Sequence, residues 1–216
     1  MEEFAVKPAI VAEIAQGKTR NLSFGGYTWR VLEVRGNQVL LLAEDIVEKR
    51  AYHTALTDVT WETCALRAYL NGEFYDSFSA EDKARIALTR NDNPDNTWKM
   101  WCEEIVKTPG GSATDDRVFL LSVQEVLKYF PGLQLHKDSD EDEFDEFEDY
   151  DEWYYGPDER LVVKSNDVMR WWWLRSPGYA PYYAVCVNSA GYVCLGGNNV
   201  NYMIGGLRPA LWLTLP

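Results

Sequence analysis

The chain has 216 residues, of which 46% are hydrophobic and 14% aromatic, so it can form one globular domain without disulfide or metal support. The net charge of −13, with no clustered basic patch, argues against nucleic-acid partners. No apolar run approaches the ~20 residues that a membrane-spanning helix requires, so no membrane insertion is expected. The acidic start, MEEFAVKP, lacks the basic and apolar regions of a signal peptide. We therefore expect a single domain over residues 1–216.

The first elements predicted along the chain are a helix and a hairpin. Residues 1–18 have the apolar spacing of a short amphipathic helix, which Gly17 would end. The apolar runs 27–34 and 38–44 flank the tripeptide RGN, a pattern typical of a β-hairpin with an exposed turn.

Two helices are predicted next. Thr60 could cap the first, over residues 60–75, and Ser79 could begin the second. The buried face of the first helix would carry Trp61, Ala65, Ala68 and Tyr69. Residues 89–101 are rich in Asn, Asp and Pro and are expected to form a loop.

The clearest local signal is a capping box at Ser122 and Glu125. It follows an apolar β run at 118–121, and the helix that it opens should end at Phe130, before Pro131-Gly132. Further strands are expected in LVVKS, WWWLRSPG and LRPALWLTLP. Strands at both ends with helices between them predict an α+β fold with mainly antiparallel strands.

Between these elements lies an acidic insert, residues 137–156. Its central part, 138–152, holds eleven of the 34 acidic residues and no basic one, which leaves the rest of the chain nearly neutral. A solvated loop or short helix is expected, with Phe144 and Phe147 against the body. A calcium site is the alternative, but the spacing of a dedicated calcium loop is missing.

The segment 176–207 contains no Asp, Glu, Lys, Arg or His, although 25% of the whole chain is charged. Within it, YAVCVNSAGYVCL predicts a hairpin whose loop, Ser189-Ala190-Gly191, places Gly191 in the left-handed position. This register pairs two sets of core residues, Val187 with Val193 and Val185 with Leu195. The opposite, outward face would present Cys186, Asn188, Tyr192 and Cys194.

The outward and loop positions of this segment are mostly Tyr, Asn, Ser, Gly and Ala, the residue types that dominate antibody paratopes. An uncharged surface is unusual for a protein that only needs to stay in solution. A binding surface is therefore one interpretation. A tightly packed, glycine-rich sheet edge is the other.

The blocks WWWLRSPG and GLRPALWL, with the Asn- and Tyr-rich stretch between them, resemble the C-terminal part of variable proteins that retroelements diversify in bacteria, phages and archaea. The segments YTWRVLEV, TWETCALRAYLN and RVFLLSVQEV likewise resemble a domain of unknown function common in gut bacteria and phages. In the first family, a template rich in Asn codons is copied with errors at adenines, so that chosen positions vary. The resemblance implies a fold similar to C-type lectins and the formylglycine-generating enzyme, which displays these positions for ligand binding.

The resemblance implies a candidate variable region at 176–207. The residue types Asn, Tyr, Ser, Cys, Gly, Ala and Pro are all reachable from an Asn codon by changes at its first two bases. The candidate ligand-binding residues are Tyr179, Ala180, Pro181, Tyr182, Tyr183, Cys186, Asn188, Ser189, Ala190, Tyr192, Cys194, Asn198, Asn199, Asn201 and Tyr202. The expected partner is a protein or glycan, with a cell surface as one place where it could occur. The expected location of the chain is cytoplasmic or phage-particle associated.

Two other functions stay open: a structural phage or envelope module with a fixed surface, and a metal-dependent enzyme of the related fold. Neither a nucleophile elbow nor a phosphate-binding glycine loop is present, so we predict no enzyme, catalytic residue, cofactor or metal site. Cys186 and Cys194 would lie opposite each other as two thiols, a disulfide or a metal pair, with no companion His. The three Trp at 171–173 could be a sugar-stacking platform or core, and core is favoured.

Six further polar residues are assigned no role in binding. Arg175 and Arg208, which flank the uncharged stretch, are expected to bond loop carbonyls. The pair Asp115-Asp116 is read as a turn. His53 and His136 are read as ordinary surface or loop residues.

Overall fold

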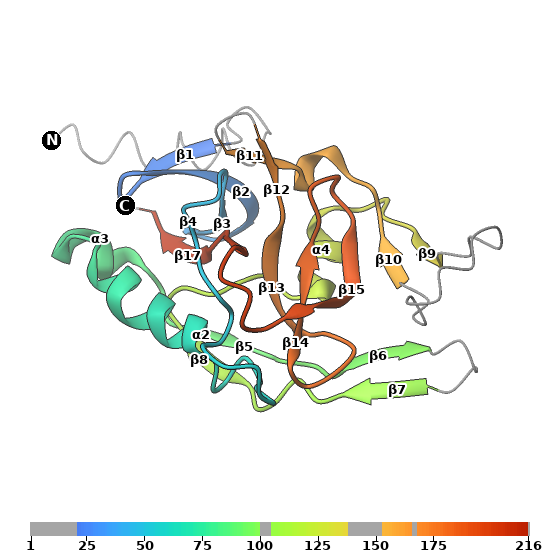
Figure 1. Ribbon diagram of the computed structural model, residues 1–216. Coiled ribbons are helices and arrows are strands. Elements are labelled where there is room, and N and C mark those ends of the chain that lie inside the picture. The colour runs from blue at the N-terminus through green and yellow to red at the C-terminus, as the bar shows by residue number, and fades with distance from the viewer. Residues whose placement is uncertain (1–20, 100–104, 138–152, 166–167, 216) are drawn as a thin grey trace, which may run out of the picture.

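A computed structural model describes residues 21–99, 105–137, 153–165 and 168–215 (Figure 1). In this part of the chain, the predicted α+β architecture with mainly antiparallel sheets is confirmed. The predicted helix at 1–18 and the acidic residues 138–152 lie outside the described residues. Among the described residues, no helix has both the length and the apolar character needed to cross a membrane.

One sheet has four antiparallel strands in the order β1-β2-β3-β17. Their bounds are β1 Asn21–Phe24, β2 Tyr27–Arg35, β3 Gln38–Ala43 and β17 Ala210–Thr214. The predicted hairpin is confirmed, because β2 pairs with β3 around Gly36, whose φ of +58° a side chain would disfavour. The last strand of the chain therefore pairs with one of the first.

The second large sheet has seven strands in the order β4-β16-β13-β14-β15-β10-β9. Their bounds are β4 Glu48–Lys49, β9 Leu135–Lys137, β10 Trp153–Tyr155, β13 Trp172–Pro177, β14 Tyr183–Val187, β15 Val193–Asn199 and β16 Gly206–Leu207. The acidic insert thus connects two antiparallel strands, β9 and β10. Trp172 and Trp173 are fully buried at the centre of this sheet, which confirms the core interpretation for these two.

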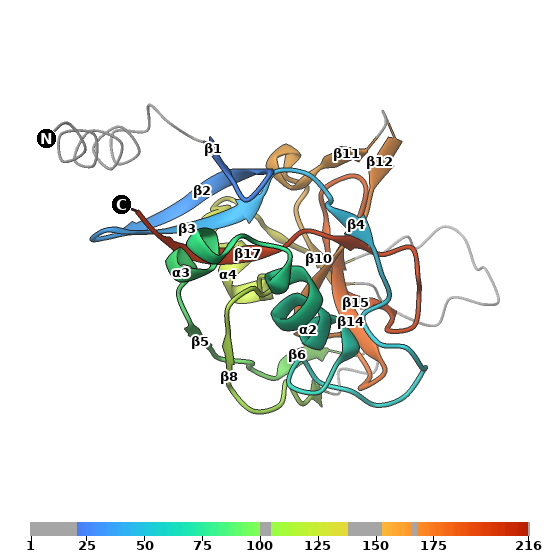
Figure 2. The same ribbon diagram turned by 90° about the vertical axis from the view of Figure 1, so that its left-hand side faces the viewer.

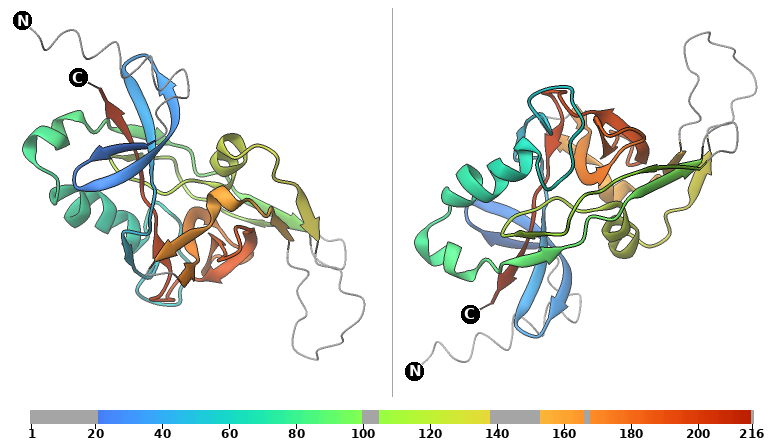
Figure 3. Two further views of the ribbon diagram at one scale, coloured as in Figure 1. Left: turned by 90° about the horizontal axis from the view of Figure 1, so that it is seen from above. Right: turned by 90° about the horizontal axis from the view of Figure 1, so that it is seen from below.

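Three two-stranded pairs complete the described strands. They are β5 Thr89–Asn91 with β8 Thr114–Asp116, β6 Asn96–Lys99 with β7 Ile105–Thr108, and β11 Val163–Ser165 with β12 Val168–Arg170. The β6–β7 pair and the β9–β10 pair both project on the side away from α2 and α3 (Figure 3). The predicted loop at 89–101 was wrong in part, because it contributes β5 and β6.

The helices are short, and two of the three predicted caps are confirmed. Their bounds are α2 Ala65–Tyr69, continued by a π-helical turn η1 Leu70–Phe74, then α3 Ala80–Arg85, α4 Val123–Tyr129 and a 3₁₀ turn η2 Glu159–Leu161. Ser79 caps α3, and the capping box of Ser122 and Glu125 opens α4, as predicted. Helices α2 and α3 lie on the same side of the molecule as the four-stranded sheet (Figure 2).

Three local predictions were wrong. The first helix begins after Cys64, whose sulfur accepts from the Arg67 N–H, and not after Thr60. The residues that follow Thr60 form a turn that is not helical. The buried face of the helix carries Leu66, Leu70 and Phe74, whereas Ala68 is exposed. Residues 118–121 are fully buried but form only an isolated bridge from Phe119 to Ala210.

The pair Asp115-Asp116 was read as a turn, but both residues lie in β8. The Asp116 carboxylate is completely buried and accepts from Trp61 Nε1 at 3.1 Å, Arg67 Nε at 2.6 Å and Asn91 Nδ2 at 3.0 Å. A buried charge needs such partners, so Asp116 fixes α2 to the β5–β8 pair.

Arg175 of β13 is the most connected buried cation among the described residues. Its Nη1 donates to the Leu120 carbonyl at 2.7 Å and to the Glu125 carboxylate, and its Nη2 donates to the Asp92 carbonyl at 3.1 Å. Its Nε donates to Asn93 Oδ1 at 3.2 Å. The predicted carbonyl-bonding role of Arg175 is confirmed, and it joins the central sheet to α4 and to the loop before β6.

Replacing Arg175 with Met should lower the free energy of unfolding by about 3 kcal/mol, because the buried acceptors and the Glu125 carboxylate lose their donor. Urea unfolding followed by tryptophan fluorescence measures this change. The matched control is Arg90→Met, since Arg90 forms an exposed pair with Asp115 and should contribute within about 0.5 kcal/mol. Equal effects of the two substitutions would contradict the assigned role of Arg175.

A second prediction concerns Glu33 of β2, which accepts from Arg35 Nε at 2.7 Å, from Lys128 Nζ at 2.8 Å and from the Tyr129 hydroxyl. The Arg35 bond, followed by those from Lys128 and Tyr129, lowers the pKa of Glu33 to about 2, against burial, which raises it. The folded pKa lies below the ordinary value of 4.5, so the stabilisation is complete above about pH 4.5 and is lost as the pH falls toward 2.

As the pH is lowered from 5 to about 2.5, the free energy of unfolding of Glu33→Gln should therefore fall less than that of the unsubstituted protein. Urea midpoints measured across this range test the difference. The control is Glu73→Gln, which changes an exposed carboxylate of η1 and should leave the pH profile unchanged. A parallel profile for Glu33→Gln would show that this carboxylate is not linked to folding.

Candidate binding surface

The hairpin β14–β15 carries most of the candidate residues. Its predicted turn is confirmed, since Gly191 has a φ of +87° and the Asn188 N–H donates to the Tyr192 carbonyl at 2.8 Å. The pairing of Val187 with Val193 is also confirmed, and Val185, Val187, Val193 and Leu195 are all buried. These four side chains form the core face of the hairpin.

A bulge changes the register in the middle of the hairpin. Cys186 pairs with Cys194, but Ala184 pairs with Asn198. The register therefore shifts between Ala184 and Cys186. Gly197 lies in the bulge with a φ of +76°, and a Cβ there would approach the Ala184 carbonyl oxygen to 2.2 Å. The predicted pair of Val185 with Leu195 is therefore replaced by a glycine bulge, which sequence alternation alone does not reveal.

Cys186 was expected to face outward, and this was wrong because the side chain is buried. It shares a sheet face with Trp173, its partner on β13. The segment that follows β4 covers this face, since the Arg50 carbonyl accepts from Trp173 Nε1 at 2.9 Å and the Tyr52 ring contacts the Trp173 ring edge-on. Cys194, directly opposite Cys186, is half-buried.

The structure separates the candidate residues into two groups at opposite ends of the hairpin (Figure 1). The turn end holds Asn188, Ser189, Ala190 and Tyr192. The other end, which we call the loop-end surface, consists of residues 53–59, 178–183 and 198–204. The strand between the two ends has five residues, or about 16 Å, so the ends form separate surfaces.

The turn end is held by its own side chains. Asn188 Oδ1 accepts from the Ala190 N–H at 2.9 Å and from the Tyr192 N–H at 3.0 Å. The Tyr192 ring packs edge-on against Tyr154 of β10, 5.0 Å between centroids. Only Ser189 and Ala190 are fully exposed within this group.

At the loop-end surface, backbone hydrogen bonds connect the two predicted loops. The Val200 N–H donates to the Tyr182 carbonyl at 3.1 Å, and the Tyr179 N–H donates to the Gly196 carbonyl at 3.0 Å. The Tyr183 ring contacts two other rings, with its centroid 4.3 Å from that of Tyr179 and 5.1 Å from that of Tyr182. Pro181, Tyr182 and Tyr202 are exposed, whereas Tyr179, Ala180, Tyr183, Asn198, Asn199 and Asn201 are half-buried.

A third segment, residues 53–59, belongs to this surface and was missed from the sequence. The His53 N–H donates to the Val200 carbonyl at 2.7 Å, and the Val59 N–H donates to the Pro181 carbonyl at 3.0 Å. Its exposed Leu56 thereby joins a segment more than 120 residues later in the chain. No local pattern signals such a long-range contact.

Exposed apolar side chains gather on the loop-end surface. Among the residues whose exposure the structure describes, seven large hydrophobic residues are exposed, and five of them lie on these three segments. These five are Leu56 (51% exposed), Tyr182 (37%), Tyr202 (46%), Met203 (78%) and Ile204 (64%). Clustering of this kind marks interaction sites more often than single exposed residues do.

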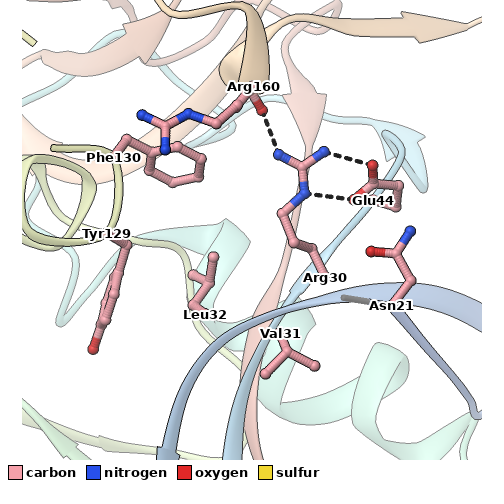
Figure 4. A pocket seen from close by; sticks show the side chains of 8 residues that line it. All are labelled: Asn21, Arg30, Val31, Leu32, Glu44, Tyr129, Phe130 and Arg160. Atoms are coloured by element: carbon pink, nitrogen blue, oxygen red, sulfur yellow. Dashed lines mark hydrogen bonds and ion pairs between the residues drawn. The ribbon is translucent and has the colours of Figure 1, made fainter. Parts of the chain in front are cut away.

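A pocket of about 420 Å³ lies elsewhere, between β2, the end of α4 and η2 (Figure 4). Each nitrogen of the Arg30 guanidinium at its centre already donates within the protein, to Glu44 at 2.5 and 2.8 Å and to the Arg160 carbonyl at 2.8 Å. The Arg160 guanidinium pairs with Asp158. Because both cations are bonded within the protein, this pocket offers less for a ligand than the loop-end surface.

The described residues hold no group of three or more His, Cys, Asp or Glu that could bind a metal. Burial raises the pKa of the Cys64 thiol to about 12, so this cysteine acts as a helix cap rather than as a nucleophile. His53 Nδ1 accepts from the Ala65 N–H at 3.2 Å, a structural role beside the same cap. Arg208 is fully buried and donates from Nε to the Ala43 carbonyl at 2.8 Å, as its predicted structural role requires.

Comparison with known proteins gives a family for this chain. Residues 36–215 match the family described as Domain of unknown function (DUF6273). No curated protein and no solved structure matches the chain. Since the match spans most of the sequence, the chain belongs to the DUF6273 family.

Proposed function

We propose that this protein binds ligands non-covalently through the loop-end surface, and that a retroelement diversifies its exposed Tyr and half-buried Asn side chains. One observation supports this most: most of the exposed large hydrophobic residues of the described chain lie on three segments joined by backbone hydrogen bonds. The scaffold beneath is buried and ordered, so little backbone freedom is lost on binding. A change of side chain then alters the contacts without altering the fold.

The burial pattern fits a fixed core beneath variable surface positions, with one exception among the candidate residues, the buried Cys186. Val185, Val187 and Val193 are fully buried, while Pro181 and Tyr182 lie at the surface of the same hairpin region. Buried positions must stay fixed because loss of core volume costs stability, whereas exposed positions tolerate most side chains. A C-type-lectin-like architecture remains part of the proposal, supported by the resemblance of the C-terminal blocks and by the pairing of β17 with β3.

A fixed interface with a partner subunit is the second candidate, favoured by the exposure of Met203 and Ile204. Both functions use the same surface. They differ in whether the Tyr and Asn positions tolerate substitution without loss of folding or of binding.

Substitution of exposed candidates should leave the fold intact. Tyr182→Asn, Ser189→Tyr and Tyr202→Ser should each change the free energy of unfolding by less than about 0.5 kcal/mol. Val187→Ala should lower it by about 2 kcal/mol, because it leaves a cavity in the core face. Urea unfolding measures all four variants, and losses above about 1.5 kcal/mol at the exposed positions would contradict the display role.

Binding capacity is tested with two displayed libraries of equal size. One randomises Pro181, Tyr182, Asn199, Asn201 and Tyr202, and the control randomises five exposed positions near and on α3, namely Glu73, Asp76, Ala80, Glu81 and Ala84. Selection on a panel of folded proteins and neutral oligosaccharides should give binders of micromolar Kd or tighter from the first library alone. Equal yields from the two libraries, or loss of folding in the first, would contradict the proposal.

A further inference from the structure

The tripeptide Tyr202-Met203-Ile204 protrudes from the loop-end surface between two buried anchors. On one side, Val200 is fully buried and its carbonyl accepts from His53. On the other, the Gly205 carbonyl accepts from the Arg50 N–H at 2.9 Å. A Cβ on Gly205 would lie 2.0 Å from Trp173 Nε1, so the chain must be glycine there to return into the core. The loop is thus fixed at both ends while three large side chains point to solvent.

This arrangement has a physical cost that folding does not explain. Met203 and Ile204 are 78% and 64% exposed and are adjacent to each other and to Tyr202. Exposed apolar side chains in a row promote association, and a monomeric protein gains no stability from them. A constrained, apolar tripeptide is instead suited to insertion into a partner, because its ordering cost has been met by the fold.

The electrostatic character of the surface restricts the partner. Residues 178–183 and 198–204 carry no charged side chain, and residues 53–59 carry one, the exposed Asp58, although the whole chain has a net charge of −13. Phosphate groups and acidic partners would find no Lys or Arg on the three segments, and a basic partner would find Asp58 alone. A neutral partner remains, either an apolar protein surface or a neutral glycan.

Side-chain chemistry decides between these two partners. The Tyr and Asn side chains of this surface offer the flat rings and planar amides that bind neutral sugars, but its three most exposed large side chains, Leu56, Met203 and Ile204, offer neither. Methionine adapts its flexible, polarizable side chain to irregular apolar surfaces and is common at surfaces that bind many partners. The three aliphatic side chains therefore match apolar protein side chains better than sugar hydroxyls.

The genetic code adds a further constraint, which rests on the proposed diversification. Changes at the first two bases of an Asn codon, AAC or AAT, leave C or T in the third position. Methionine is encoded only by ATG, so this route cannot produce Met203. Leu56 lies far outside the uncharged region. These two residues would stay constant while Tyr182 and Tyr202 vary.

We propose that Met203, supported by Leu56, is a constant apolar anchor for protein partners, and that the surrounding Tyr and Asn positions select among those partners. The partner class is a folded protein or peptide with an exposed, uncharged apolar segment. Anchors of this kind carry much of the affinity at interfaces, while the residues around them adjust specificity.

The test uses the full chain and a random 12-residue peptide library, with an array of neutral oligosaccharides in parallel. Peptides selected on the unsubstituted protein should be apolar and uncharged, and their Kd should rise about tenfold or more on Met203→Ser. Leu88→Ser, which changes an equally exposed residue outside this surface, should leave the Kd unchanged. Circular dichroism and urea midpoints confirm that both variants fold.

The outcomes separate this inference from the proposed function. Peptides or sugars whose binding depends on Tyr182 and Tyr202 but not on Met203 would overturn the anchor and leave the binding function intact. Ligands indifferent to all three positions would contradict both. Selection of glycans alone, of charged peptides, or of no peptide at all would overturn the protein-partner assignment.

Discussion

The buried guanidinium of Arg175 is the constraint on which the rest of the structure depends. It lies at the centre of the larger sheet and bonds the carbonyls of Leu120 and Asp92, so that the start of α4 and the loop before β6 are held against β13. Its own carbonyl accepts from the Tyr52 hydroxyl at 3.0 Å, and Tyr52 precedes the segment that supports the loop-end surface. One residue, through its side chain and its backbone carbonyl, therefore connects the core to the candidate binding site.

From this centre, order extends outward to the loops through hydrogen bonds from side chains to backbone carbonyls. The Asn96 side chain donates to the carbonyls of Pro177 and Leu195, at 2.9 and 3.1 Å, which holds the end of β13 and the middle of β15 together beside the loops. Thr108 Oγ1 donates to the Tyr179 carbonyl at 2.9 Å. The exposed side chains can therefore be polar or apolar, large or small, because main-chain groups and buried side chains determine the positions of the loops. This is the physical condition that a variable surface needs.

The sequence predicts the elements set by local chemistry well. The capping box at Ser122, the cap at Ser79 and the turn at Gly191 each depend on a few neighbouring residues, and all three are confirmed. The core of the terminal hairpin followed from alternation. The burial of Cys186 did not, because the covering segment around Tyr52 lies more than 130 residues earlier.

The candidate site was predictable only in part, for the same reason. The Tyr and Asn content of residues 176–207 pointed to a surface, but the division of this surface into two ends depends on strand length and on the glycine bulge at Gly197. Leu56 joins the site through a long-range contact, and the exposure of Met203 and Ile204 was not predicted from the sequence. The buried role of Asp116 likewise depends on partners in α2 and β5.

The central claim is that a constant scaffold displays a surface diversified by a retroelement, and DNA sequence tests this most directly. The measurement is the sequence of the gene and of the few kilobases around it. The account predicts a near-copy of codons 176–207 beside a reverse transcriptase gene, differing from the coding copy only where the near-copy has adenine, and identical at the codon of Met203. A genome without such a copy, or with differences spread over the buried valine codons, would contradict it.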